Sequence, residues 1–415
     1  MNTGLPWREP SRQTTDDKGW PVDRQSSGGN LRSAERLLLA GCLSLYALIV
    51  IFGSLSVNHE QQYVFLAESF LDRKLYFVSM PEHWNDTAAY AGRHYWPLGP
   101  LPAVLLMPFV FLWRFAGANF YQGYVSLPLS LLTCWLCFRL ARNCGRSPVE
   151  SAWLVLAFCG ASSYVGVAAI SMSWSLAQVI AILLLFLAVY EWLGRRRWWL
   201  IGFLLGLTTT ARVSAGLNIA LFMGAALFCE TKEKVKAFLR LTTGFAIPVL
   251  LLAAYNFARF GSFIETGYGY QPPAPQDFAA SSLANVLPHL RVFLLGMPEV
   301  LDRFPFVATN PLGMSVLLLS PWLLYLGSLK MDRFNYLALA NCALVLVGVL
   351  AWRSTGQLQL GYRFSLDFLP IIMLLLARSG FTGKEMYLGF KTLTVIGLLS
   401  TLFFLVSLIG LIPQG

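Results

Sequence analysis

"YWPLGPLPAVLLMPFVFLWRF", residues 95–115, is the stretch on which the fold depends, because it is apolar and long but carries four prolines. As a helix it would extend about 30 Å, which is the thickness of the hydrocarbon core of a bilayer. Each proline, however, removes a helical hydrogen bond. If this stretch crosses a membrane, every later segment of the chain changes sides.

The composition indicates a membrane protein. Hydrophobic residues make up 56% of the 415 residues, charged residues only 13%, and the mean hydropathy is +0.58, whereas soluble domains hold about 25% charged residues. The run 198–229 is interrupted by "TTTARVSAG" and predicts a helical hairpin with its tip at Arg212. The other predicted spans are 37–56, 120–140, 152–170, 174–193, 241–258, 313–329, 335–351, 364–377 and 393–412. We therefore expect an all-α polytopic membrane protein with about eleven transmembrane helices.

The distribution of basic residues indicates how the proline-rich stretch is placed. If 97–116 does not cross and the N-terminus is cytoplasmic, the 31 Lys and Arg divide into 21 inside and 10 outside. If it crosses, 13 lie inside and 18 outside. The positive-inside rule favours the first arrangement. Residues 97–116 are therefore predicted to form a re-entrant or juxtamembrane element of the first outer loop, and the C-terminus is predicted to lie outside.

This topology divides the chain into a disordered cytoplasmic tail, 1–33, and a membrane-embedded domain, 34–415. The tail has few apolar residues and no long apolar run. The net charge is +10, but the inner connectors carry most of it, which indicates contact with anionic lipid headgroups and not with nucleic acid. The long polar segments gather on the predicted outer side, so function is expected there.

Two carboxylates stand where the first outer loop leaves and re-enters the membrane. In "SVNHEQQYVFLAESFLDRKLYF" (56–77) apolar residues recur at helical spacing, which predicts an amphipathic helix on the outer interface, with Glu60 at its start,. Asp86 lies at the other end of the loop. Carboxylates at such low-dielectric boundaries have shifted pKa values suited to proton transfer or metal binding. Glu60 and Asp86 are therefore candidate functional residues.

Five motifs occur in an order that matches a known family. They are "NHEQQYVFLAESFL" (58–71), "NDTAAYAGRHYWPLGPLPAVLL" (85–106), "GFLLGLTTTARVSAGLNIALF" (202–222), "YNFARFGSFIETGYGY" (255–270) and "GYRFSLDFLPIIMLLLA" (361–377). Together they resemble the GT-C membrane glycosyltransferases that use lipid-phosphate-linked sugars, including protein O-mannosyltransferases and aminoarabinose transferases. The resemblance covers nearly the whole chain from residue 34. The acidic pair of that family falls on His59 and Glu60, so a histidine replaces the usual aspartate.

The resemblance implies a GT-C-like fold and an inverting glycosyltransferase. It would move a sugar from a polyprenyl-phosphate donor to an acceptor on the outer face of a bacterial cytoplasmic membrane. Such a reaction needs fixed cations at the leaving phosphate and a general base, for which Asp86 and Glu60 are the candidates, with His59 beside them. The candidate substrate-binding residues are Arg212, Arg259, Arg353, Arg363, Tyr362, His94 and Tyr95.

Other roles for these residues stay open at the sequence level. An arginine at the end of a span often reaches to lipid phosphates, and His94 and Tyr95 also fit interfacial anchors. His94 is a candidate metal ligand as well, and the part of a divalent metal ion, the sugar, the acceptor and the oligomeric state are left open. The alternative functions are a transporter or flippase for lipid-linked saccharides and a catalytically inactive subunit of an envelope complex. A translocation path needs polar groups at mid-membrane, but the predicted spans contain few, Asp367 being an exception.

Overall fold

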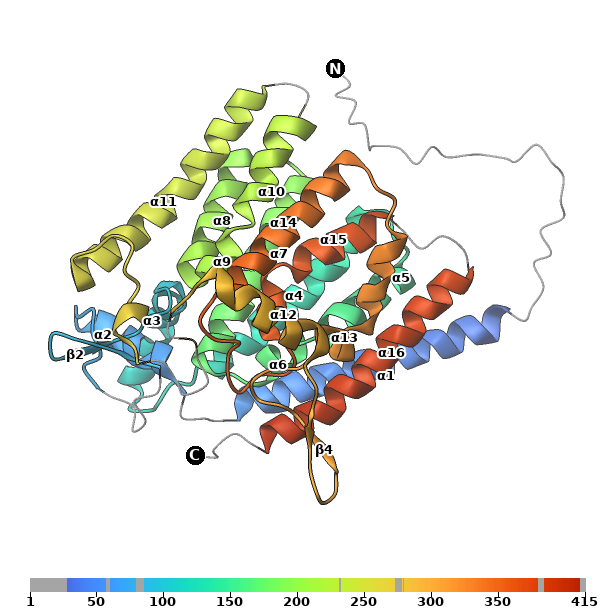
Figure 1. The fold of residues 1–415 in the computed structure, drawn as a ribbon, viewed down its shortest axis with the longest axis horizontal. Helices are drawn as coiled ribbons and strands as arrows, with labels where there is room; N and C mark the ends of the chain where they lie inside the picture. Colours follow the sequence, from blue (N-terminus) through green and yellow to red (C-terminus); the bar gives the residue numbers. More distant parts are fainter. Residues whose placement is uncertain are drawn as a thin grey trace.

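The computed structural model describes residues 28–56, 60–79, 86–230, 233–272, 278, 280–379 and 384–410. This part of the chain is mostly helical, and its strands are limited to two short hairpins. Figure 1 shows the long helices running along one diagonal direction, with α1 (Gly28–Leu55) and α16 (Lys384–Ile409) near the lower edge of the view. The expected helical class is confirmed. Helix α1 begins at Gly28, six residues before the predicted start of the membrane domain.

Six helices of the described chain are long and apolar enough to cross a membrane. They are α1, α4 (Gly123–Asn143), α7 (Ser173–Leu193), α11 (Lys234–Phe260), α14 (Arg333–Leu350) and α16. In their most apolar stretches, 22% of residues are buried by the rest of the chain in α1 and 28% in α11, against 78% in α7. Helix α7 is therefore the centre of the bundle. The apolar outer faces of α1 and α11 are suited to lipid, because so much apolar surface is unfavourable in water.

Four predicted spans fold as shorter, interrupted helices. Residues 152–170 form α5 (Pro148–Val155), a π-helical turn (Leu156–Gly160) and α6 (Tyr164–Ala169). Residues 198–229 form α8 (Trp198–Ala211), α9 (Val213–Gly216), α10 (Ile219–Gly224) and a π-helical turn (Ala225–Cys229). Residues 313–329 form α13 (Val316–Leu319) and a 3₁₀ helix (Pro321–Ser328), and 364–377 form the 3₁₀ turn η6 (Arg363–Asp367) and α15 (Leu369–Ser379). The count of about eleven spans stays a prediction.

Close packing of α8 on α11 depends on glycines. A Cβ atom added at Gly202 would stand 1.9 Å from the carbonyl oxygen of Leu241, and one at Gly244 would stand 2.1 Å from that of Trp199. Small residues let two helix backbones approach in this way, which strengthens packing where the hydrophobic effect is weak. The tight α8–α11 pair holds the end of α8, and with it Arg212, beside the end of α11.

The first outer loop forms a compact layer over one end of the bundle. Its helix α2 (Gln62–Leu71) packs on α3 (Leu101–Phe115), the helix within the proline-rich stretch. Strands β1 (Ala88–Tyr90) and β2 (Arg93–Tyr95) pair in antiparallel register between them. The two-residue turn of this hairpin has positive φ at both positions, as a type I′ turn requires,. Strands were not expected from the sequence, whereas the packed, non-spanning-length helix at 101–115 agrees with the predicted element.

The remaining outer segments lie between α11 and α13. They comprise the 3₁₀ turns η3 (Tyr268–Tyr270) and η4 (Leu283–Asn285), α12 (Val286–Leu295) and the hairpin of β3 (Glu299–Val300) with β4 (Val307–Ala308). Helix α12 lies where the sequence predicted no span, within a long outer loop.

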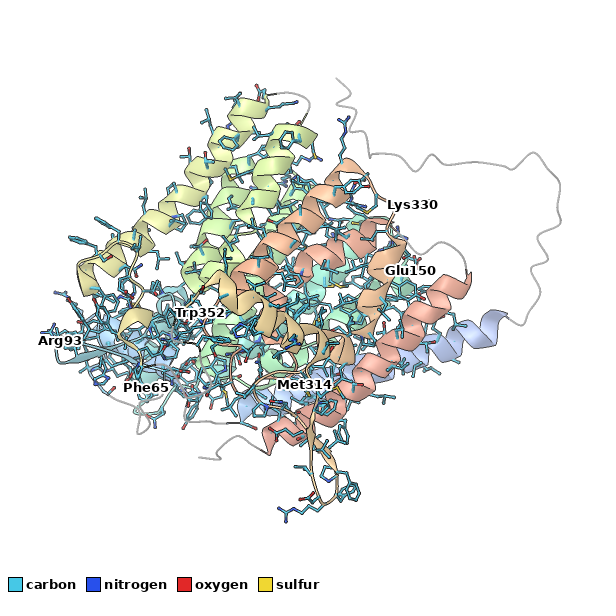
Figure 2. The ribbon with its side chains drawn as sticks, in the orientation of Figure 1. Phe65, Arg93, Glu150, Met314, Lys330 and Trp352 are labelled. Atoms are coloured by element: carbon cyan, nitrogen blue, oxygen red, sulfur yellow. The ribbon has the colours of Figure 1, made fainter. Side chains whose placement is uncertain are left out.

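The predicted inner and outer segments separate to opposite ends of the molecule. Figure 2 shows Arg93 of the first outer loop far from Glu150 and Lys330, which lie in or beside predicted inner connectors. At that inner end the connectors contact one another, since Arg378 pairs with Asp332 at 3.0 Å. The relative sidedness thus agrees with the charge count. Which end faces the cytoplasm stays a prediction.

Candidate functional site

Arg212 stands at the break between α8 and α9. The hydroxyls of Thr208, Thr209 and Thr210 donate to main-chain carbonyls one turn earlier, a contact that often bends helices. Arg212 then adopts an extended backbone, with φ −154° and ψ 109°. The predicted tip at Arg212 is confirmed. Because the helix breaks there, the Arg212 side chain extends from the C-terminal end of α8.

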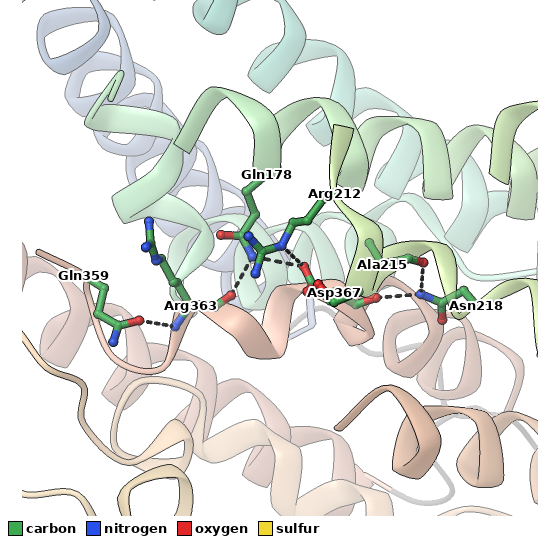
Figure 3. Close-up of polar contacts among 8 residues, drawn as sticks. Gln178, Arg212, Ala215, Asn218, Gln359, Arg363 and Asp367 are labelled. Carbon is green, nitrogen blue, oxygen red and sulfur yellow. Dashed lines mark hydrogen bonds and ion pairs between the residues drawn. The ribbon is translucent and has the colours of Figure 1, made fainter. Parts of the chain in front are cut away.

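The carboxylate of Asp367, in η6, holds the Arg212 side chain in place at this break. Nε of Arg212 donates to Oδ1 of Asp367 at 2.6 Å, and the two side chains are only 9% and 1% exposed. The hydroxyl of Ser214 donates to Oδ2 at 2.6 Å, and Nε2 of Gln178 donates to Oδ1 at 3.3 Å. Figure 3 also shows Asn218 bonded to the main-chain oxygen of Asp367. The ion pair and the surrounding hydrogen bonds together orient the Arg212 side chain rigidly,.

Arg363, the first residue of η6, has a buried guanidinium that the described chain does not fully use. The residue is 8% exposed, and neither Nε nor Nη1 has a hydrogen-bond partner among the described residues. Its guanidinium carbon lies 5.5 Å from the ring centre of Trp174, whose indole Nε1 is likewise buried and unpaired in the described chain. Figure 3 shows this guanidinium turned away from the Arg212–Asp367 pair. Three buried N–H donors without acceptors suit an anionic, oxygen-rich ligand.

The electrostatics of Arg363 point the same way. Its 3₁₀ turn lies outside the long spanning helices, and burial, followed by the like charge of Arg212, lowers the pKa of Arg363 to about 9. Burying an arginine without an adjacent counter-ion is costly. A bound anion would remove part of this cost.

Four charged side chains surround Tyr268, the first residue of η3. Burial, followed by the carboxylate of Asp86, raises the pKa of Tyr268 to about 12, while Arg212, Arg363 and Arg353 oppose that rise. The four charged residues are spread along the sequence between positions 86 and 363. The fold therefore brings one predicted carboxylate and three predicted arginines near a single tyrosine.

Gln271 joins Asp86 to Arg353. Its Nε2 atom donates to Oδ1 of Asp86 at 3.1 Å, and its Oε1 atom accepts from Nη2 of Arg353 at 2.8 Å. Asp86 is exposed and has a left-handed backbone, with φ 64°, which aspartate tolerates better than most residues. The carboxylate is thus held at a defined place on the outer edge of the site.

Glu60 is held at the N-terminal end of α7. Its main-chain oxygen accepts from the amide of Ser173 at 3.1 Å and from Nε2 of Gln122 at 2.8 Å, and its carboxylate accepts from Gln62. Ser173 precedes Trp174, so Glu60 and Arg363 are both neighbours of the first turn of α7. Whether the carboxylates of Glu60 and Asp86 converge stays a prediction, and His59 lies outside the described residues.

The other predicted site residues have structural contacts. Arg259 is buried, and its Nη1 and Nη2 atoms donate to the main-chain oxygen of Trp96 and the side chain of Asn256, both at 2.7 Å, so it holds the first outer loop onto α11. Tyr95 packs edge-on against Phe260.

Two more predicted residues also have contacts within the fold, and their part in substrate binding stays a prediction. Nδ1 of His94 lies 3.3 Å from the hydroxyl of Thr87, across the β1–β2 hairpin. The ring of Tyr362 is fully buried against Phe293 and Phe364. Within the described chain, then, Arg212, Arg353, Arg363 and Asp86 come together, and Tyr362 belongs to the core behind them.

A cavity of about 430 Å³ opens beside Arg212. The polar residues of its lining are Arg212, Ser214, Asn256, Arg259, Thr266 and Tyr268. The rest of the lining is apolar or glycine and includes Leu217, Leu252, Trp352 and Phe364. This volume is in the range of small-ligand sites, and the mixture of cations and apolar side chains fits an amphiphile with an anionic head.

The sequence did not single out several residues of this site. Trp174 and Gln178 lie within an apolar run, and Gln271 lies in a glycine- and proline-rich loop, so neither pattern nor spacing marked them. Asp367 was noticeable only as a charge within an apolar segment. No group of three or more His, Cys, Asp or Glu side chains arranged for a metal ion occurs in the described ranges.

No protein-family model and no curated protein matches the chain. Among solved structures, the fold is similar to that of ArnT from Cupriavidus metallidurans, whose crystal structure contains bound undecaprenyl phosphate. The match covers 89% of this chain and 77% of that one, with a TM-score of 0.51 and 12% sequence identity. The chain therefore has a GT-C-like fold, and its long apolar helices mark it as an integral membrane protein.

Proposed function

We propose that this protein is a glycosyltransferase that moves a sugar from a polyprenyl-phosphate donor to an acceptor on the outer face of a bacterial cytoplasmic membrane. The observation that carries the proposal is the set of buried, unpaired donors of Arg363 and Trp174 beside Arg212. These donors lie in a fold similar to that of a protein crystallised with undecaprenyl phosphate. The proposed topology has about eleven spans, a cytoplasmic N-terminus and an outer C-terminus.

In the proposed reaction, a hydroxyl oxygen of the acceptor attacks the anomeric carbon of the sugar. The bond from that carbon to the phosphate oxygen breaks, and polyprenyl phosphate leaves with the electron pair. Arg363 and Arg212 stabilise the charge that grows on the phosphate. The acceptor proton passes to a carboxylate, Asp86 or Glu60, acting as general base. Attack opposite the leaving group inverts the anomeric carbon.

Asp86 suits the role of base because of its surroundings. It lies at the outer, solvent-exposed edge of the site, where a water-borne acceptor can reach it. The Gln271–Arg353 contact orients it and provides positive charge nearby. Glu60 is held at the first turn of α7, where it suits an orienting role or the role of base.

Binding of undecaprenyl phosphate to the purified protein in lipid nanodiscs tests the anion site. Arg363→Ala should weaken binding about 10- to 100-fold, because a charge-assisted contact contributes about 1.5–3 kcal/mol. Arg240→Ala, an exposed arginine on α11, is the control and should bind like the parent. A folded Arg363→Ala protein with parental affinity would contradict the proposed phosphate site.

Activity separates an enzyme from the alternatives. Incubation with a panel of polyprenyl-phosphate sugars and candidate acceptors should release polyprenyl phosphate. A transporter or flippase would instead move the intact donor across a vesicle membrane without releasing it, and an inactive subunit would do neither. Translocation without release would replace the glycosyltransferase proposal.

A further inference from the structure

The segment from α12 through the β3–β4 hairpin exposes many large apolar side chains. Met297, Val300 and Phe304 are 73%, 86% and 84% exposed. The others on this segment are Leu283, Leu287, Leu294, Leu295 and Phe306. In soluble proteins, large exposed apolar patches mark a binding surface. None of these side chains takes part in the site described above.

The root of the hairpin lies near the C-terminal end of α16, one of the six candidate spanning helices. The hydroxyl of Thr309 donates to the main-chain oxygen of Phe404 at 2.6 Å, and the amide of Thr309 donates to the hydroxyl of Ser407 at 3.0 Å. Both partners belong to the apolar helix that ends at Ile409. At 1.5 Å per residue, Phe404 and Ser407 lie about 3 to 8 Å below that helix end. The hairpin therefore leaves the protein within one or two turns of the end of a spanning segment.

The hairpin projects away from the body of the molecule. Figure 1 shows it leaving the lower edge of the body beside α16, at an oblique angle to the long helices. The contact of β4 with α16 confirms that the two are neighbours. An exposed apolar hairpin at this depth meets the headgroup region of a bilayer.

We propose that α12 and the β3–β4 hairpin form an interfacial anchor that inserts its apolar side chains into the outer leaflet, with phospholipid as the partner. The charged side chains of the segment are Arg291, Glu299, Asp302 and Arg303, and their charges sum to zero. Such a segment suits the membrane interface, where apolar side chains enter the lipid and charged side chains stay among the headgroups. Phenylalanine, methionine and leucine supply the apolar area.

The anchor is linked to the anion site by two hydrogen bonds. The main-chain oxygen of Leu312, just after the hairpin, accepts from Nε2 of Gln359 at 3.0 Å. Oε1 of Gln359 in turn accepts from the amide of Arg363 at 3.2 Å. Fixing the hairpin in the leaflet would therefore also fix the depth of the η6 turn, where a lipid-borne ligand is bound.

Photocrosslinking of the full chain in native membranes tests the anchor. The photoreactive residue benzoylphenylalanine replaces Phe304 in one variant and Val300 in another. Leu251, exposed on the spanning helix α11, is the lipid-facing control position, and Arg93 of the first outer loop is the water-facing one. After illumination, intact-protein mass spectrometry should find phospholipid adducts at 304 and 300 in yields within about threefold of position 251 and at least about tenfold above position 93.

A protein adduct at 304 would instead identify a protein partner and overturn the lipid assignment. Lipid adducts at 251 but not at 304 or 300 would overturn the anchor altogether. A second measurement introduces a charge with Phe304→Asp in two proteins, one with the crosslinker at position 300 and one with it at position 251. Lipid adducts at 300 should fall severalfold, while adducts at 251 stay unchanged. The binding of undecaprenyl phosphate is measured separately, so a failure of the anchor leaves the proposed phosphate site standing.

Discussion

Replacing Asp367 by asparagine tests the claim that a buried ion pair orients Arg212. Asparagine keeps the shape of the side chain, and its oxygen can still accept from Arg212. The negative charge, however, disappears from a pair whose side chains are 9% and 1% exposed. Leaving one charge of a buried pair uncompensated costs about 3–5 kcal/mol, and the retained hydrogen bonds favour the lower value. For a chain of 415 residues, about 3 kcal/mol corresponds to a fall of roughly 3 °C in the unfolding temperature.

The chain contains a matched control at the opposite end of the bundle. Asp332 pairs with Arg378 at 3.0 Å, but its side chain is 53% exposed. Solvent screens such a pair, which contributes about 1 kcal/mol or less, so Asp332→Asn should lower the unfolding temperature by at most roughly 1 °C. Combining Asp367→Asn with Arg212→Met should recover part of the loss, because the unpaired cation is then gone.

Thermal unfolding of the three variants in one detergent, followed by intrinsic fluorescence and by loss of the monodisperse peak, provides the measurement. The reasoning is refuted if Asp367→Asn unfolds no earlier than Asp332→Asn. It is also refuted if adding Arg212→Met lowers the unfolding temperature further, since the cost would then come from packing and not from the unpaired charge.

Three other predictions follow from the same geometry. Trp174→Phe removes one buried N–H donor but keeps an aromatic ring, so the packing of Arg363 should not change. The affinity for undecaprenyl phosphate, measured by direct binding, should fall about 3- to 10-fold. Parental affinity would exclude the indole from the anion site. Once a sugar donor is known, Asp86→Asn or Glu60→Gln should reduce the rate of polyprenyl phosphate release about 100- to 10,000-fold, whichever is the general base, and parental rates in both would remove this loop from catalysis. Cysteines placed at 93 and at 196, in a background without native cysteines, should react with an impermeant maleimide in intact cells at 93 only, and labelling at 196 alone would reverse the topology.

Hydrophobic pattern and charge predicted the helical class, the break at Arg212 and the packed helix within the proline-rich stretch. These features depend on neighbours in sequence. Prolines weaken a helix where they stand, and threonine hydroxyls donate to carbonyls of the preceding turn. Basic connectors favour the cytoplasmic side of the membrane whatever the rest of the fold is. The sequence also indicated which charged residues lie on the predicted outer side, because they fall in the polar segments between apolar runs.

Which of those residues meet was decided only by the tertiary structure. Arg259 and Arg363 are both arginines beside apolar helices, and no local signal separates them. In the fold, carbonyl and amide oxygens occupy both terminal nitrogens of Arg259 and leave only its Nε unpaired, whereas Arg363 is buried beside Trp174 with both Nε and Nη1 unpaired in the described chain. Arg259 contacts Trp96 and Arg363 lies beside Trp174, and the residues of each pair are more than a hundred positions apart in sequence. Sequence patterns record the period and polarity of each segment, but the partners of a buried charge depend on how the helices pack.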